Sequence, residues 1–195
     1  MSDYRNLMRE LHKAHQEFKK EWKDWRNGNV KSTEKKKHKK LKGQEPETVT
    51  IARDKFYDAL NRLYDTQLIP LEIAFRQNAP TATDDVIEFL SVDITAHRCG
   101  YAKEWFLTKL KSVELTSSQK LKLQQIVLEL CESYNFRREI NYWGRLMIKL
   151  ANQDFVEKLY ALSNSSNRYA QVKSKWLLDK ILHHRKDLAV NSLEP

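Results

Sequence analysis

The residues best suited to bind an anionic partner form a dense basic run near the amino terminus. Six lysines fall within eight positions: Lys35, Lys36, Lys37, Lys39, Lys40 and Lys42. Such a run can neutralise several phosphates and release their counterions, which gives salt-dependent affinity with little sequence preference. The alternative is a solvated linker that is kept open by repulsion between its own charges. In a eukaryotic cell, the same run is also compatible with a nuclear import signal.

A second set of basic residues lies in three segments, 97–111, 137–150 and 168–186. These segments hold 14 Lys or Arg and only three Asp or Glu. Segments 84–93, 117–134 and 153–162, in contrast, hold three Lys or Arg and eight Asp or Glu. The candidates for binding an acidic partner are Arg98, Lys103, Lys109, Arg137, Arg138, Arg145, Lys149, Lys173, Lys175 and Lys180. If these side chains share one surface, that surface attracts a partner of opposite charge. The alternative is that Lys and Arg simply favour the outside of helices.

Five tryptophans raise the question of stacking with nucleic-acid bases. Trp22 and Trp25 lie among several lysines, and aromatic rings in a basic setting suit single-stranded nucleic acid. Their helical spacing favours the other interpretation, in which both rings supply buried area between two helices. We expect the same packing role for Trp105, Trp143 and Trp176.

The side chains that commonly carry catalysis or hold metals are few and scattered. His12 and His15 have a spacing seen in metal sites, but no third ligand accompanies them, and a protein metal site needs at least three. His97 and Cys99 lack the third partner expected for nucleophilic catalysis. The sequence contains no glycine-rich phosphate loop, no zinc-protease motif and no nucleophile elbow. We therefore expect no enzyme activity, no cofactor and no bound metal.

The composition of the chain favours helices as the elements that position these residues. Of 195 residues, only four are Gly and four are Pro, while 31% are charged, and this predicts an all-α fold. Two cysteines are typical of a reducing compartment. No apolar stretch is long enough to span a membrane or to direct secretion. We expect a cytoplasmic protein without a membrane partner.

Residues 1–78 are predicted to form an antiparallel helical hairpin. Apolar or aromatic residues at positions 4, 8, 11, 18, 22 and 25, with His15 in the one gap, follow a 3.5-residue period that is typical of helices packed lengthwise. The first helix should end at 27–29, and a second one opens near 46–48. Between them, residues from about 30 to 44 are expected to form a mobile basic loop. Its like charges repel and it has almost no apolar side chains to bury, so nothing compensates for the conformational entropy that ordering would cost. Pro70 then breaks or kinks the second helix.

Residues 79–195 are predicted to form helices in pairs. Segment 84–90 recurs as 154–159, and the second helix of each pair carries one tryptophan, at 105, 143 and 176. A period of 33 to 38 residues is typical of helical-hairpin repeats. In the middle pair, Ser117 or Ser118 is expected to cap the first helix. By period and helix pattern the region resembles HEAT-like α-solenoids, and the resemblance implies a rigid curved surface with the second helices on its concave side.

Together these features predict a helical hairpin followed by about three HEAT-like helical-pair repeats. We interpret the chain as a non-enzymatic binding module in which the basic second helices line a groove that holds an acidic protein partner. The alternative is sequence-independent binding of RNA or DNA through the basic run and the groove. A third hypothesis is self-association, because a seam with a 3.5-residue period can close between two chains as well as within one.

Overall fold

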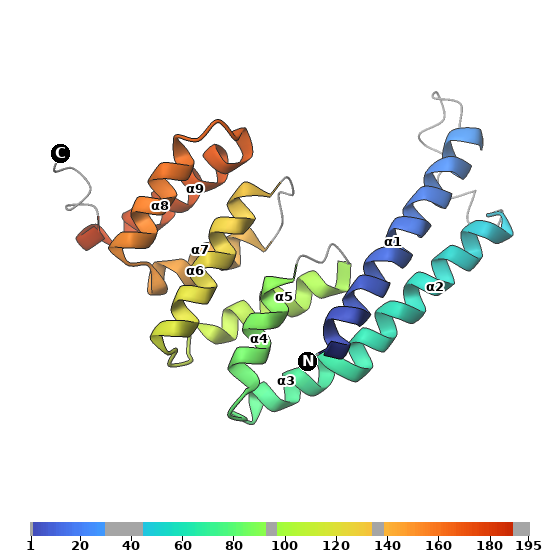
Figure 1. Ribbon diagram of the computed structural model, residues 1–195, viewed down its shortest axis with the longest axis horizontal. Coiled ribbons are helices and arrows are strands. Elements are labelled where there is room, and N and C mark those ends of the chain that lie inside the picture. The colour runs from blue at the N-terminus through green and yellow to red at the C-terminus, as the bar shows by residue number, and fades with distance from the viewer. Residues whose placement is uncertain (1, 30–44, 93–96, 134–138, 189–195) are drawn as a thin grey trace. The chain divides into compact units, whose positions relative to one another are not determined.

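The computed structural model describes residues 2–29, 45–92, 97–133 and 139–188, and all regular structure in these ranges is helical (Figure 1). This confirms the all-α prediction. The chain divides into two compact units, Met1–Ala79 with Ile94–His97 and Pro80–Asp93 with Arg98–Pro195. The first unit contains α1 (Ser2–Asn29), α2 (Glu47–Leu63), the π-helical segment η1 (Tyr64–Leu68) and α3 (Ile69–Arg76). The lysines of the basic run, at positions 35 to 42, lie outside the described residues.

Helices α1 and α2 pack against each other as an antiparallel hairpin (Figure 1). Two ion pairs fix the direction, because Glu10 pairs with Arg62 at 3.3 Å while Glu17, one heptad further along α1, pairs with Lys55 at 3.2 Å. The face of α2 that the 3.5-residue period predicted is buried, and it consists of Val49, Ala52, Phe56, Ala59 and Leu63. Within the described residues, the seam therefore closes inside one chain.

Aromatic rings fill the middle of this hairpin. Phe56 of α2 stacks on His15 of α1, with ring centroids 4.9 Å apart, and on Phe18 at 6.0 Å. Trp22 and Trp25 continue the row along α1, with centroids 5.1 Å apart, and both are half-buried. Burial also lowers the pKa of His15, because a charged imidazole is poorly solvated there. These contacts agree with the packing role that the spacing favoured.

Pro70 does not end the helix that precedes it. Instead, helix α2 passes through η1 into α3, and the N–H of Ile69 donates to the carbonyl oxygen of Tyr64, five residues earlier. The wider turn lies just before a proline, which has no N–H to donate to the helical ladder. Helix α3 then closes at a turn in which Asn78 adopts a left-handed conformation with φ of 54°, as is common for Asn after a helix end.

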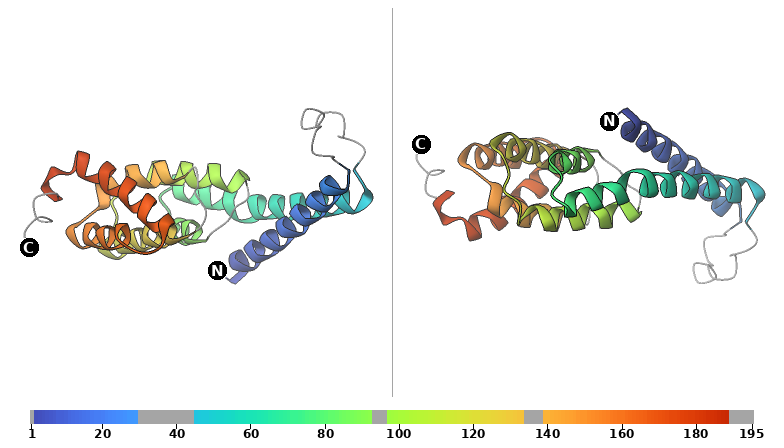
Figure 2. Two further views of the ribbon diagram at one scale, coloured as in Figure 1. Left: turned by 90° about the horizontal axis from the view of Figure 1, so that it is seen from above. Right: turned by 90° about the horizontal axis from the view of Figure 1, so that it is seen from below.

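The second unit consists of three helical pairs and a final short turn, and its helices lie in two layers (Figure 2). The first helices of the pairs pack in chain order, α4 on α6 and α6 on α8, while α9 packs on α8 and on α7. The pairs are α4 (Ala82–Ser91) with α5 (His97–Leu110), α6 (Ser117–Glu132) with α7 (Ile140–Leu150), and α8 (Gln153–Ser163) with α9 (Arg168–His184), followed by η2 (Lys186–Leu188).

Local sequence explains where the later helices begin. Thr116 caps α6 in a capping box, since its hydroxyl accepts from the N–H of Gln119 and the Gln119 side chain accepts from the N–H of Thr116. This corrects the expectation that Ser117 or Ser118 is the cap. Asn152 caps α8 and Asn167 caps α9 through their side-chain oxygens.

Candidate functional site

Two lysines that the sequence placed in a binding groove are buried in the second unit. Lys103 of α5 is 4% exposed, and its Nζ donates to the carbonyl oxygen of Val92 at 2.5 Å, at the end of α4. Burial lowers the pKa of Lys103 to about 8, against the opposing attraction of Glu139. The role of Lys103 is therefore structural, because a buried ammonium that is bonded to a helix end is not available to a partner.

Lys173 of α9 is buried in the same way, at 2% exposure. Its Nζ donates to the carbonyl oxygens of Leu130 at 2.7 Å and Ser133 at 2.6 Å, in the last turn of α6. Carbonyls in a last turn lack helical partners, and a cation is favourable at the negative end of the helix dipole. The expectation that Lys103 and Lys173 face a groove is corrected here, since both hold the ends of first helices.

Two further basic residues bind helix ends without being buried. Nζ of Lys149, in the last turn of α7, donates to the carbonyl oxygen of Lys111 at 2.7 Å, just after α5. Arg185, which follows α9, donates from Nη1 to the carbonyl oxygen of Ala151 at 3.4 Å. Its Nη2 also forms an ion pair with Oδ2 of Asp187 at 2.6 Å. Both residues therefore link neighbouring pairs while leaving part of their charge on the surface.

Three other cations of the second helices lie beside aromatic rings on the same helix. Nζ of Lys109 lies 5.9 Å from the centroid of Trp105 on α5, and Nζ of Lys180 lies 4.6 Å from that of Trp176 on α9. On α7, Cζ of Arg145 lies 5.6 Å from the Tyr142 centroid. All three rings are half-exposed. We call the set formed by Trp105, Lys109, Tyr142, Arg145, Trp176 and Lys180 the cation–aromatic face.

The parts of this face on α7 and α9 are held together by a close approach of the two helices. A Cβ added at Gly144 would lie 2.8 Å from Cδ of Lys180 and 3.0 Å from ring atoms of Trp176. Only the absence of a side chain at this position lets α9 lie so near. Arg145 is near enough to Lys180 to lower its pKa, as a second cause after burial. Arg145 of α7 and Lys180 of α9 are thus two cations close enough to repel each other.

Few carboxylates offset this positive charge. On the described parts of α5, α7 and α9, the acidic residues are Glu104, which is buried, and Asp179, which is exposed. Large apolar side chains are exposed on the same helices, among them Tyr101 at 51% and Val172 at 54%. Exposed Tyr, Trp and Arg with few carboxylates are the composition that protein interfaces favour.

The three tryptophans of the second helices do not occupy equivalent positions. Trp143 is 2% exposed and belongs to the core, which agrees with its predicted packing role, whereas Trp105 and Trp176 lie half-exposed beside a lysine. The residue of α7 that corresponds to those two is Tyr142. A sequence signal for this face does exist, namely an aromatic residue followed three or four positions later by Lys or Arg, but it is short and common.

The other candidates from the sequence fall into two groups. Lys175 is exposed on α9, and Arg145 belongs to the cation–aromatic face. The remaining candidates lie outside the described residues or have undescribed side chains; they are Lys35, Lys36, Lys37, Lys39, Lys40, Lys42, Arg98, Arg137 and Arg138.

The two cysteines and the metal-ligating residue types can be placed in the described part of the chain. Burial raises the pKa of Cys99 to about 11 and of Cys131 to about 12, so both thiols stay protonated near neutral pH. Across the ranges that the structure covers, no three His, Cys, Asp or Glu side chains group as metal ligands. The described helices also include none with the length and apolarity to cross a bilayer.

Comparison of the chain with protein-family models, with curated proteins and with solved structures found no match.

Proposed function

We propose that the protein is a non-enzymatic binding module whose second unit is a HEAT-like helical-repeat array that holds an acidic polypeptide on the cation–aromatic face. The observation that carries this proposal is the threefold recurrence of a half-exposed ring with a cation beside it, once on each second helix. A repeated surface of this kind offers several equivalent contacts along an extended partner.

The chemistry of the face suits a polypeptide in which acidic residues alternate with apolar ones. Carboxylates would pair with Lys109, Arg145 and Lys180, and Arg145 offers a planar fork for bidentate bonds. Apolar side chains would pack on the edges of the rings and on exposed residues such as Val172. Because each cation is already held against a ring, less side-chain entropy is lost when a carboxylate binds.

A polypeptide is favoured over nucleic acid because the faces of the rings are partly occupied. Nζ of Lys180 is close to the Trp176 centroid, at 4.6 Å, and the side chain would have to move before a base could stack there. A carboxylate, in contrast, binds by pairing with the cations and does not need the faces of the rings. Sequence-independent binding of RNA or DNA is retained as the second candidate because rings beside cations also suit base stacking and phosphate contacts.

Titration with labelled ligands separates the two candidates. A fluorescein-labelled peptide that alternates Glu with Leu or Phe, and a single-stranded RNA and a DNA of similar length, would be followed by fluorescence anisotropy at low and at physiological salt. We expect the peptide to bind at both salt concentrations. Binding of RNA or DNA alone would reverse the order of the candidates, and the absence of binding by any ligand would contradict both.

Charge reversal tests the location of the binding surface. Replacing Arg145→Glu and Lys180→Glu together should weaken peptide binding by at least tenfold, because both attractions become repulsions. The matched control is Lys122→Glu with Lys158→Glu, which makes the same change in net charge on exposed positions of α6 and α8. Equal losses in the two double variants would show that only net charge matters and would refute the assignment of the face.

A further inference from the structure

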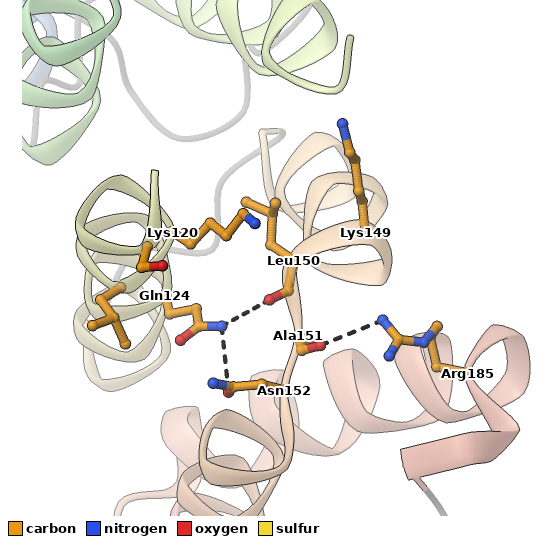
Figure 3. Close-up of a pocket in the computed structure, with 9 residues that line it drawn as sticks. Lys120, Gln124, Lys149, Leu150, Ala151, Asn152 and Arg185 are labelled. Carbon is orange, nitrogen blue, oxygen red and sulfur yellow. Dashed lines mark hydrogen bonds between the residues drawn. The ribbon is translucent and has the colours of Figure 1, made fainter. Parts of the chain in front are cut away.

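A separate cavity of about 430 Å³ lies within the second unit, where several helix ends meet (Figure 3). One wall is the first part of α6, and the other is the end of α7 with the connection to α8. The lining residues are Ser117, Lys120, Leu121, Gln124, Lys149, Leu150, Ala151, Asn152 and Arg185. The residues of the cation–aromatic face do not line it, so the two features are distinct.

The lining of the cavity is cationic, with Lys120, Lys149 and Arg185 and no carboxylate among its residues. The charge of Arg185 is offset by Asp187, and the ammonium of Lys149 is bonded to neutral carbonyl oxygens. Lys120 differs from both, because it forms no hydrogen bond or ion pair with any residue that the structure describes. Figure 3 shows its side chain reaching from α6 toward Leu150, across the space between the two walls. An uncompensated ammonium in a concave site favours an anion.

Polar groups near Lys120 offer the hydrogen-bond donors and the acceptor that a phosphate ester needs. The capping box at Thr116 uses the N–H of Gln119, which leaves the N–H groups of Ser117, a lining residue, and of its neighbour Ser118 without a described partner at the positive end of α6. Gln124 is only 4% exposed; its Nε2 donates to Leu150 O at 2.8 Å, while its Oε1 has no described hydrogen-bond partner. This oxygen can therefore accept a hydrogen bond from a ligand hydroxyl or from water.

We propose that this cavity binds a small phosphate monoester that carries hydroxyl groups, as a sugar phosphate does. Lys120 and the first amides of α6 bind the phosphate dianion, and Gln124 accepts a hydrogen bond from a hydroxyl. The volume supports an ester over the free ion, because small-molecule sites measure roughly 300–1,000 Å³ and a lone phosphate would leave most of this space empty. The proposal does not depend on the acidic polypeptide.

Isothermal titration calorimetry of the whole protein with glucose 6-phosphate, inorganic phosphate and glucose tests the chemistry. We expect glucose 6-phosphate to bind most tightly, phosphate more weakly and glucose not at all. No detectable binding of glucose 6-phosphate at millimolar concentrations would overturn the proposal. Inorganic phosphate binding as tightly as glucose 6-phosphate would overturn the assignment of an ester, leaving a plain anion site.

Three variants locate the site. Lys120→Ala should weaken glucose 6-phosphate binding about tenfold, the typical effect of losing one charge-assisted hydrogen bond. Lys122→Ala removes an exposed lysine of the same helix that does not line the cavity, and it should leave the affinity unchanged. Lys180→Ala should also have no effect. Binding that is lost in Lys180→Ala but kept in Lys120→Ala would move the ligand to the cation–aromatic face and overturn this proposal.

Discussion

Helices α5 and α9 each carry lysines with opposite fates, and the comparison shows how much the surroundings decide. Lys103 and Lys173 are buried and bonded to the ends of first helices, while Lys109 and Lys180 lie beside half-exposed tryptophans. In each helix the two lysines are six or seven positions apart. The basic residues of one helix therefore fall into two groups: some bond to the ends of neighbouring helices, and others lie on the surface beside aromatic rings.

The largest loss of stability should follow from removing a buried lysine. Lys173→Met deletes the donor to Leu130 O and Ser133 O, and we expect the free energy of unfolding to fall by about 2–4 kcal/mol because both carbonyls lose a charged partner. Urea unfolding followed by circular dichroism measures the loss. The control is Lys175→Met, an exposed position two residues away, which should change stability by less than about 0.5 kcal/mol. Equal losses at both positions would erase the distinction between the two classes of lysine.

The pH dependence of stability should identify Lys103 as a buried base. Its pKa is about 8 in the folded chain against 10.5 in an unfolded one, so between these values the unfolded state binds more protons. The free energy of unfolding of the wild type should therefore rise from pH 8 to pH 10.5 relative to that of Lys103→Met. Below pH 8 the difference should be constant. A difference that stays flat or falls over the interval would contradict this account.

A side chain at Gly144 should separate α7 from α9. Gly144→Leu forces atoms into space that Trp176 and Lys180 occupy, and overpacking of this kind costs about 1–3 kcal/mol. Thermal unfolding measures the cost, and the smaller Gly144→Ala should lie between this variant and the wild type. If Gly144→Leu unfolds at the wild-type temperature, the two helices are free to part and the face has no fixed geometry.

The smallest effect on stability should come from the outer cations. Lys109→Ala and Lys180→Ala each remove one cation beside a ring, and we expect less than about 1 kcal/mol for either, since exposed cation–π contacts contribute little. Their effect on peptide affinity should be larger than their effect on unfolding. The reverse pattern, with intact affinity and lost stability, would place these lysines with Lys103 and Lys173.

Periodicity in the sequence was sufficient to predict the helices and the seam of the hairpin. A buried face every 3.5 residues depends on side-chain type alone, and Val49, Phe56 and Leu63 are buried as their spacing predicts. The end of α1 also follows from local residues, because it ends at Asn29 beside a glycine. These features need no knowledge of the rest of the chain.

The site could be predicted only in outline. A lysine on a helix binds a partner or a neighbouring carbonyl according to which helix end lies within reach, and this depends on tertiary packing. Lys173 finds its acceptors 40 and 43 residues away in the sequence. The cavity near Lys120 was missed for the same reason, since its walls come from segments that no local pattern connects.

The π-helical turn at Tyr64–Leu68 has a consequence for how the first unit tolerates changes in length. Such a turn holds one residue more than an α-helical turn, so deleting a residue there would leave an ordinary helix running from Glu47 to Arg76. Because the wider turn already absorbs the extra residue, α3 would keep nearly the same direction around the helix axis after the deletion. Ile69 and Ile73, both exposed now, would stay on the same side of the helix. The segment is therefore the point at which the loss of a single codon would leave the rest of α3 in register.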